Sequence, residues 1–245
     1  MKVLLDSNGL QAAVHQGIHP NPKSKNAANR RLITFLAIIE SLGCEPSFIE
    51  EKVSEITDDL LINCSCLVIT TRMPRLPRQP ESEINTIQRF VQRGGSLLVM
   101  SNHPFNRFEE SMPDKYIVSR FGATLHKSWY PDSGNRKGFV EIWKDDLYPH
   151  SITNGLCGPI VFNNGCRIST RIGNVVAKLP SVSEGADIFA VAIENHEDIK
   201  ARIVVTADSG FIGDEDTNFP GPGLINSGDN IGFIRQVFEW LLKLR

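Results

Sequence analysis

The apolar residues of this chain fall into two kinds of pattern, short continuous runs and stripes at helical spacing. The continuous runs predict strands over Lys2–Leu5, Pro46–Ile49, Cys66–Thr71, Ser96–Met100 and Arg202–Ala207. Strands that are apolar without alternation are buried on both faces, as in a parallel sheet covered by helices. The pattern therefore predicts an α/β fold built around a mostly parallel sheet.

Three helical stripes lie between or after these runs. One ends at Gly43, a second follows Pro80 and ends at Gly94-Gly95, and a third follows Asp229, the expected N-cap. Their apolar positions are Ala28, Leu32, Phe35, Leu36, Ile39 and Leu42 in the first, Ile84, Ile87 and Val91 in the second, and Ile234, Val237, Phe238, Leu241 and Leu242 in the third. Each spacing places the apolar side chains on one helix face, which we expect to pack on the sheet.

The rhythm changes between residues 123 and 195, where short β-like pieces are separated by Gly, Pro and Asn. The pieces are Phe139–Trp143, Ile160–Phe162, Val175–Leu179 and Ile188–Ile193. We expect them to form a mostly antiparallel elaboration at the edge of the main sheet. A typical domain has about 150 residues, but we expect the 245 residues to form one domain, 1–245, with a β-rich elaboration at about 123–195.

The composition is that of an ordinary globular protein and removes several function classes. Hydrophobic residues make up 41% and charged residues 22%, and the formal net charge is −2, so no basic surplus suggests a nucleic-acid partner. The N-terminal apolar run is too short for a signal peptide, and no apolar stretch approaches the roughly 20 residues of a membrane span. We expect a cytoplasmic protein with free cysteines and no membrane insertion. The oligomeric state stays open.

Polar residues follow four of the predicted strands. They are Asp6, Ser7 and Asn8 after the first, Thr70, Thr71 and Arg72 at the third, Ser101, Asn102 and His103 after the fourth, and Asp208 and Ser209 after the last. The carboxyl ends of parallel strands lie at one edge of a sheet, where open α/β folds bind ligands. Such residues also form turns and helix caps, so it is their accumulation at one edge that predicts a site.

Five segments carry a family resemblance. They are Asp6 at the end of the first strand, Gly-Gly-Ser-Leu-Leu-Val-Met-Ser-Asn-His-Pro-Phe at 94–105, His-Ser-Ile-Thr-Asn-Gly at 150–155, Arg-Ile-Val-Val-Thr-Ala-Asp at 202–208, and Asp229-Asn230 before a helix ending in Trp240-Leu241. Together they resemble the class I glutamine amidotransferase-like superfamily, in the branch of gliding-motility transporter-associated and intraflagellar-transport proteins. The resemblance spans nearly the whole chain and implies a flavodoxin-like, mostly parallel sheet with helices on both faces.

The chain departs from this superfamily where a nucleophile would stand. Working members carry a cysteine in a Gly-x-Cys-x-Gly elbow and a later His-x-Glu pair. Here the corresponding strand runs into Met100-Ser101-Asn102-His103-Pro104, and the last parallel strand delivers Asp208-Ser209. No such elbow surrounds any of the cysteines, which are Cys44, Cys64, Cys66, Cys157 and Cys166. We therefore expect no glutamine hydrolysis through a thiolate.

His103 keeps another catalytic hypothesis open. With Asp208 orienting its imidazole and Ser101 or a metal-bound water as nucleophile, it would make a hydrolase. Ser101 lacks a Gly-x-Ser-x-Gly context, however, and Pro104 makes His103 an equally good helix cap. Asp6, His103 and Asp208 could also hold a metal ion, although we expect neither a metal nor a cofactor.

These observations favour a non-catalytic, amidotransferase-like domain that binds a small polar ligand, glycan or peptide at the carboxyl edge of the sheet. The expected ligand-binding residues are Asp6, Ser7, Asn8, Arg72, Asn102, His103, Asp208 and Asn230. The hydrolase is one alternative. Another is a scaffold whose pocket is vestigial and whose surface binds another protein. We expect His126 and His150, in the irregular region, to pack or cap.

Overall fold

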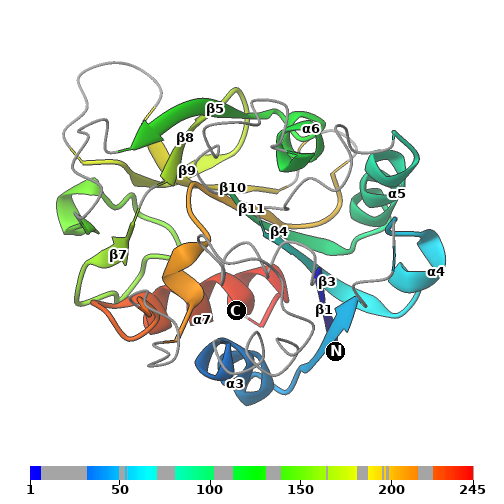
Figure 1. The fold of residues 1–245 in the computed structure, drawn as a ribbon, viewed down its shortest axis with the longest axis horizontal. Coiled ribbons are helices and arrows are strands. Elements are labelled where there is room, and N and C mark those ends of the chain that lie inside the picture. Colours follow the sequence, from blue (N-terminus) through cyan, green and yellow to red (C-terminus); the bar gives the residue numbers. More distant parts are fainter. Residues whose placement is uncertain are drawn as a thin grey trace, which may run out of the picture.

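The structure is a computed structural model that describes most of the chain. The described residues are 1–6, 32–49, 53, 55–70, 81–101, 113–130, 139–163, 165–180, 187–194, 196, 199–214 and 223–244. They form a nine-stranded central sheet, helices on both of its faces and a separate two-stranded ribbon (Figure 1).

Five parallel strands make up one half of the central sheet. They are β1 (Lys2–Asp6), β2 (Glu45–Ile49), β3 (Cys64–Thr70), β4 (Ser96–Met100) and β11 (Ile203–Thr206), in the order β2-β1-β3-β4-β11. This is the flavodoxin-like order, in which the chain changes direction between β1 and β3. All five predicted strands are confirmed, and so is the fold class.

The helices cover both faces of this sheet, as the sequence predicted. They are α3 (Ile33–Ser41), α4 (Asp58–Leu61), α5 (Glu81–Gln92), α6 (Pro113–Ser119) and α7 (Asn230–Leu241). Helices α3 and α7 pack against each other on one face, and α5 and α6 on the other (Figure 1). The predicted stripes of α5 and α7 are buried, whereas α4 and α6 were not predicted from the sequence.

The second half of the sheet is the antiparallel elaboration. Strand β10 (Ile188–Ile193) pairs antiparallel with β11 and is followed by β8 (Gly165–Thr170) and β5 (Ala123–Tyr130), while β9 (Asn174–Lys178) pairs with β10. The ribbon consists of β6 (Val140–Ile142) and β7 (Ile160–Phe162), and short 3₁₀ turns occupy η2 (Lys144–Asp146) and η3 (Gly210–Ile212). The elaboration therefore shares the edge of the main sheet, as predicted. Strands β5 and β8 were missed.

The predicted glycine stop of the first helix is confirmed. Gly43 has a φ of +73°. Its N–H donates to the carbonyl of Glu40 at 2.9 Å, and the N–H of Cys44 donates to that of Ile39 at 3.3 Å. These two bonds are those of a Schellman motif, in which a left-handed residue satisfies the last carbonyls of a helix.

At the start of the last helix, the predicted cap is right in position and wrong in mechanism. Asp229 is the N-cap of α7, but its side chain makes no hydrogen bond to the helix, because its φ of −113° and ψ of 30° are not the extended values a capping residue needs. Its carboxylate accepts instead from the N–H groups of Cys157 at 2.7 Å and Gly158 at 3.3 Å. Asp229 thus joins α7 to the loop before β7.

A second aspartate caps a helix from far along the chain. Helix α3 has Leu32 at its N-cap position and no capping side chain of its own. Oδ2 of Asp214 accepts from the backbone N–H of Thr34 at 2.9 Å, and Oδ1 accepts from the Thr34 hydroxyl. A carboxylate is favoured at a helix N-terminus by the helix dipole. This contact fixes the segment after β11 to the start of α3.

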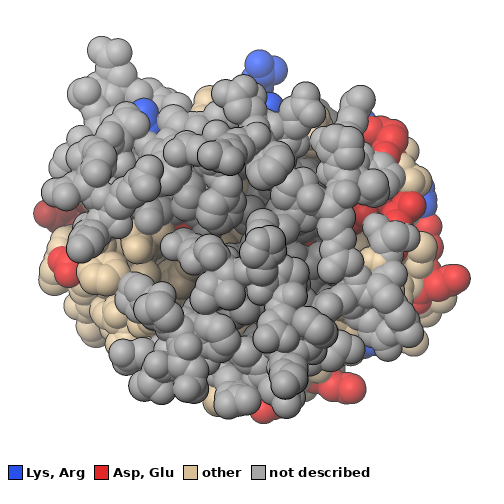
Figure 2. All heavy atoms as spheres, viewed as in Figure 1, with Lys and Arg blue, Asp and Glu red and all other residues tan. Residues whose placement is uncertain are grey.

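Acidic side chains gather on the side of the molecule formed by α4 and α5 (Figure 2). The carboxylate of Asp58 lies 2.5 Å from Arg89 and 3.1 Å from Arg93, so its charge is matched locally. Within the described parts of the chain, no helix combines the length and the apolar character that crossing a membrane requires.

Substitutions of two glycines with left-handed backbones test how closely the loop before α7 packs. A Cβ at Gly43 would meet no atom within 4 Å, whereas a Cβ at Gly228, with a φ of +53°, would lie 2.1 Å from the carbonyl oxygen of Pro159. We expect Gly43→Ala to lower the free energy of unfolding by about 1 kcal/mol through backbone strain. Gly228→Ala should lower the free energy of unfolding by roughly 1–3 kcal/mol more than Gly43→Ala does, because overpacking usually costs about this much.

Urea denaturation of the two variants and the wild type measures both costs. Equal losses in the two variants would contradict the close approach of Gly228 to Pro159.

Candidate functional site

Four polar residues end neighbouring parallel strands at one edge of the sheet, as the sequence predicted. Asp6 ends β1, Thr70 ends β3, Ser101 follows β4 and Asp208 follows β11, and each is 0% exposed. Thr70 is in register with Met100, which is in register with Thr206 two residues before Asp208. With about 4.8 Å between strands, Thr70 and the end of β11 are about 10 Å apart. The edge thus holds a row of buried polar groups.

Asp208 is the most unusual member of this row. Burial raises the pKa of its carboxyl from 3.8 to about 7, although the backbone N–H groups of Gly210, Ser209, Asn163 and Phe211 oppose this shift in part. None of these N–H groups makes a hydrogen bond of good geometry, and neither carboxyl oxygen has a hydrogen-bond partner among the described residues. Near neutral pH, Asp208 is therefore a buried group that is close to half ionised.

An aromatic cluster packs around the turn that follows Asp208. The chain continues from Asp208 into η3, where Phe211 packs on Phe189 at 5.8 Å and on Phe233 at 6.1 Å between ring centroids. Phe162 stacks on Phe189 from the ribbon at 4.7 Å. Asp208 itself is fully buried, and the loss of hydration on burial disfavours the charged form of a carboxyl group.

Three further polar side chains at this edge have buried atoms with no hydrogen-bond partner among the described residues. They are the Thr70 hydroxyl, the Ser209 hydroxyl and Oδ1 of Asn163. A buried polar atom without a partner costs roughly 1–3 kcal/mol, so a group of them at one edge points to a ligand that would satisfy them.

Asn163 is a candidate that sequence reasoning missed. It follows β7 directly, and its backbone N–H faces the carboxylate of Asp208. The available signal was the Asn-Asn pair after the apolar run 160–162. That run lies in the antiparallel region, whose strand ends were not expected to meet the parallel edge.

Asn230, a predicted ligand contact, has a different role in the structure. Its Oδ1 accepts from the N–H of Val161 at 2.8 Å, and its Nδ2 donates to the carbonyls of Val161 and Leu224, each at 2.7 Å. Both amide hydrogens are therefore used within the protein. The structure gives Asn230 the task of holding β7 against the start of α7, and we do not retain it as a ligand contact.

The remaining predicted site residues are only partly described. Ser7, Asn8, Arg72, Asn102 and His103 lie outside the described residues. Strands β4 and β11 are neighbours, and the N–H of Ser101 donates to the carbonyl of Thr206 at 2.9 Å. The described residues include no group of three or more His, Cys, Asp or Glu side chains that could hold a metal ion.

Of the two histidines expected to pack or cap, His150 does so. Nδ1 of His150 accepts from the N–H of Ile152 at 3.2 Å, and its ring packs edge-on against Trp240 at 5.3 Å. Nε2 of His126 lies 2.8 Å from the hydroxyl of Ser169.

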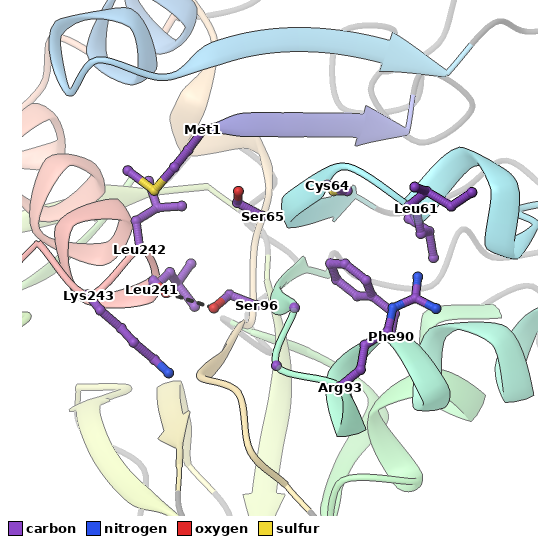
Figure 3. A pocket seen from close by; sticks show the side chains of 13 residues that line it. Met1, Leu61, Cys64, Ser65, Phe90, Arg93, Ser96, Leu241, Leu242 and Lys243 are labelled. Carbon is purple, nitrogen blue, oxygen red and sulfur yellow. Dashed lines mark hydrogen bonds between the residues drawn. The ribbon is translucent and has the colours of Figure 1, made fainter.

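A hollow of about 420 Å³ lies at the opposite, amino edge of the sheet, between the starts of β3 and β4 and the ends of α5 and α7 (Figure 3). Two of its polar side chains have partners within the protein. The hydroxyl of Ser96 donates to the carbonyl of Leu241 at 2.7 Å, and Arg93 binds Asp58. Burial raises the pKa of the Cys64 thiol to about 11, so it is not a nucleophile at neutral pH. The carboxyl edge is the better candidate site.

The pKa of Asp208 predicts a characteristic dependence of stability on pH. The folded-state pKa of about 7 lies above the ordinary value of 3.8. Between these values the folded state binds more protons than the unfolded state, so Asp208 lowers stability as pH rises through this window, by about 4 kcal/mol in total. We expect Asp208→Asn to stabilise the protein at pH 8, by up to that order, and to have little effect at pH 4.

Urea denaturation between pH 4 and pH 8 checks this. Asp58→Asn is the control with the opposite sign, because Arg89 lowers the pKa of Asp58. A loss of stability in Asp208→Asn at pH 8 as large as in Asp58→Asn would contradict the raised pKa.

The comparisons with known proteins agree with the fold. No protein-family model and no curated sequence matches the chain. Among solved structures, the mmIFT52 N-terminal domain is similar with a TM-score of 0.71 and 13% identity, over 98% of this chain and 97% of that one. The cytoplasmic protein STM1381 from Salmonella typhimurium LT2 has a TM-score of 0.63 and 12% identity, over 98% and 99%. A ThuA-like protein from Bacteroides uniformis is similar with a TM-score of 0.54 and 13% identity, over 98% of this chain and 90% of that one. At 12–13% identity these likenesses show the fold alone, which is the mixed α/β fold described above.

Proposed function

We propose that this chain is a non-catalytic binding domain that holds a small polar ligand, a glycan or a peptide at the carboxyl edge of its parallel sheet. The observation that carries the proposal is the Asp208 carboxyl group, which is fully buried and has no hydrogen-bond partner in the described structure. Strongly perturbed titratable groups cluster at functional sites, and a ligand that donates to Asp208 would offset the cost of burying it.

The partnerless atoms also indicate the chemistry of the ligand. The two oxygens of ionised Asp208 and Oδ1 of Asn163 only accept hydrogen bonds, whereas the hydroxyls of Thr70 and Ser209 can accept or donate. Acceptors dominate, so the matching ligand is rich in donors. Sugar hydroxyls and the amides or amines of a short peptide have this character.

Other polar residues at the edge extend the proposed site. Asp6 and Ser101 are buried in the same row, although each already has an interaction within the protein. We keep the sequence-based hypothesis that Ser7, Asn8, Arg72, Asn102 and His103 also contact the ligand. We also propose a cytoplasmic location, because the similar Salmonella protein is named as a cytoplasmic protein, and we keep another protein as an alternative partner.

The hydrolase is the second candidate, and one observation favours it. Ser101 and Asp208 are both buried at the carboxyl ends of the neighbouring strands β4 and β11. In this alternative, Asp208 orients His103, and Ser101 or a metal-bound water attacks the substrate.

A ligand screen with the Asp208→Asn variant tests the binding proposal. The probes are glucose, N-acetylglucosamine, glutamine and glycylglycine, each titrated by thermal shift and calorimetry. We expect at least one to raise the Tm of the wild type and of Asp58→Asn but not that of Asp208→Asn. Because donors to Asp208 favour its ionised form, binding should release protons at pH 7 and strengthen between pH 6 and pH 8.

Two outcomes would count against this function. An equal thermal shift in Asp208→Asn would place the ligand elsewhere, and the absence of any response would favour the scaffold. Turnover of chromogenic esters or glycosides that is lost in both Ser101→Ala and His103→Ala would replace the binding function with the hydrolase.

A further inference from the structure

A second hollow, of about 250 Å³, lies on the face of the sheet that carries α5 and α6. Four segments that are distant in sequence form it: the last turns of α5, the turn from α6 into β5, the turn between β8 and β9, and the connection from β10 to β11. The lining residues are Gln88, Gln92, Arg120, Phe121, Gly122, Arg171, Ile172, His196 and Ile199.

Every polar side chain that lines this hollow can donate hydrogen bonds, and two of them are arginines. Arg120 and Arg171 bring two guanidinium groups, Gln88 and Gln92 lie one helical turn apart on one face of α5, and His196 adds an imidazole. Phe121 and Ile172, the first of which is buried, supply an apolar wall. Within the described lining there is no carboxylate to neutralise the arginines.

The two arginines differ in their side-chain partners. The side chain of Arg171 has no hydrogen bond or ion pair in the described structure. Arg120 pairs with Glu81, but both side chains are well exposed, at 41% and 57%. Exposed pairs of this kind contribute little to stability, so Arg120 can exchange Glu81 for a bound anion at small cost.

The backbone holds the two arginines at one rim. The carbonyl of Gly122, beside Arg120 and Phe121, accepts from the N–H of Arg171 at 3.1 Å and from the hydroxyl of Thr170 at 3.3 Å. These bonds tie the turn before β5 to the turn after β8. The backbone that carries the two arginines is therefore fixed by the fold before any ligand binds, which reduces the backbone entropy lost on binding.

We propose that this hollow binds the phosphate group of a small phosphate monoester. Guanidinium groups recognise phosphate through paired, charge-assisted hydrogen bonds. Two guanidinium groups and two amides offer more donors than a carboxylate can accept, whereas a phosphate dianion has three terminal oxygens to receive them. The volume is below the roughly 300 Å³ at which small-molecule pockets begin, so the rest of the ligand is a short carbon chain beside Phe121 and Ile172.

Titration with inorganic phosphate and glycerol 3-phosphate tests the proposal, with acetate at matched ionic strength as the competing anion. We expect both phosphates to bind the wild type, to shift the side-chain amide NMR signals of Gln88 and Gln92, and to bind at least tenfold more weakly to Arg171→Gln. Arg93→Gln is the matched control, because it removes the same charge from the amino-edge hollow, and it should bind like the wild type.

Gln92→Glu guards against a folding artefact. It adds a carboxylate to the hollow on a helix surface while leaving both arginines in place, and it should also weaken phosphate binding at least tenfold. Asp208→Asn should bind phosphate like the wild type, which separates this site from the proposed ligand site. The proposal is overturned if neither phosphate binds, if acetate binds as tightly, or if Arg171→Gln and Arg93→Gln behave alike.

Discussion

The central constraint in this structure is the carboxyl group of Asp208, which is buried at the end of a parallel strand and has no hydrogen-bond partner among the described residues. The parallel half of the sheet is covered by helices on both faces, so its polar residues collect where the strands end. Two other aspartates, Asp229 and Asp214, accept hydrogen bonds from backbone N–H groups. Asp208 is not used in this way, and its burial lowers stability near neutral pH. Proteins keep costly groups of this kind mainly at functional sites, where activity and stability compete.

The parallel half of the fold could be predicted because its signals are local. Strand β4 is Ser96 followed by four apolar residues, and the structure has the bounds that the sequence predicted. Gly43 ends its helix through a bond pattern that only a left-handed residue permits. Strands β5 and β8 escaped prediction because only every second residue is apolar. Ala123 and Leu125, or Cys166 and Ile168, alternate with polar neighbours over too few residues to stand out.

The candidate site could be predicted in position but not in character. Parallel topology alone places Asp6, Thr70, Ser101 and Asp208 at one edge. The pKa of Asp208 depends instead on its complete burial, which arises only in the folded protein. The same holds for Asn163, and for the arginine-lined hollow, whose walls come from four separate segments. The carboxyl-edge site thus offers mainly hydrogen-bond acceptors, whereas the arginine-lined hollow offers mainly charged donors.

The most direct test of the central claim is a pH titration of the Asp208 side chain by NMR. The chemical shift of its carboxyl carbon, assigned by comparison with Asp208→Asn, reports its ionisation without reference to folding stability or to any ligand. A midpoint close to pH 7 is the result expected for a desolvated carboxyl group without a partner. A midpoint below about pH 5, near the ordinary range for aspartate, would contradict the account, because it would mean that Asp208 is hydrated or already paired within the protein.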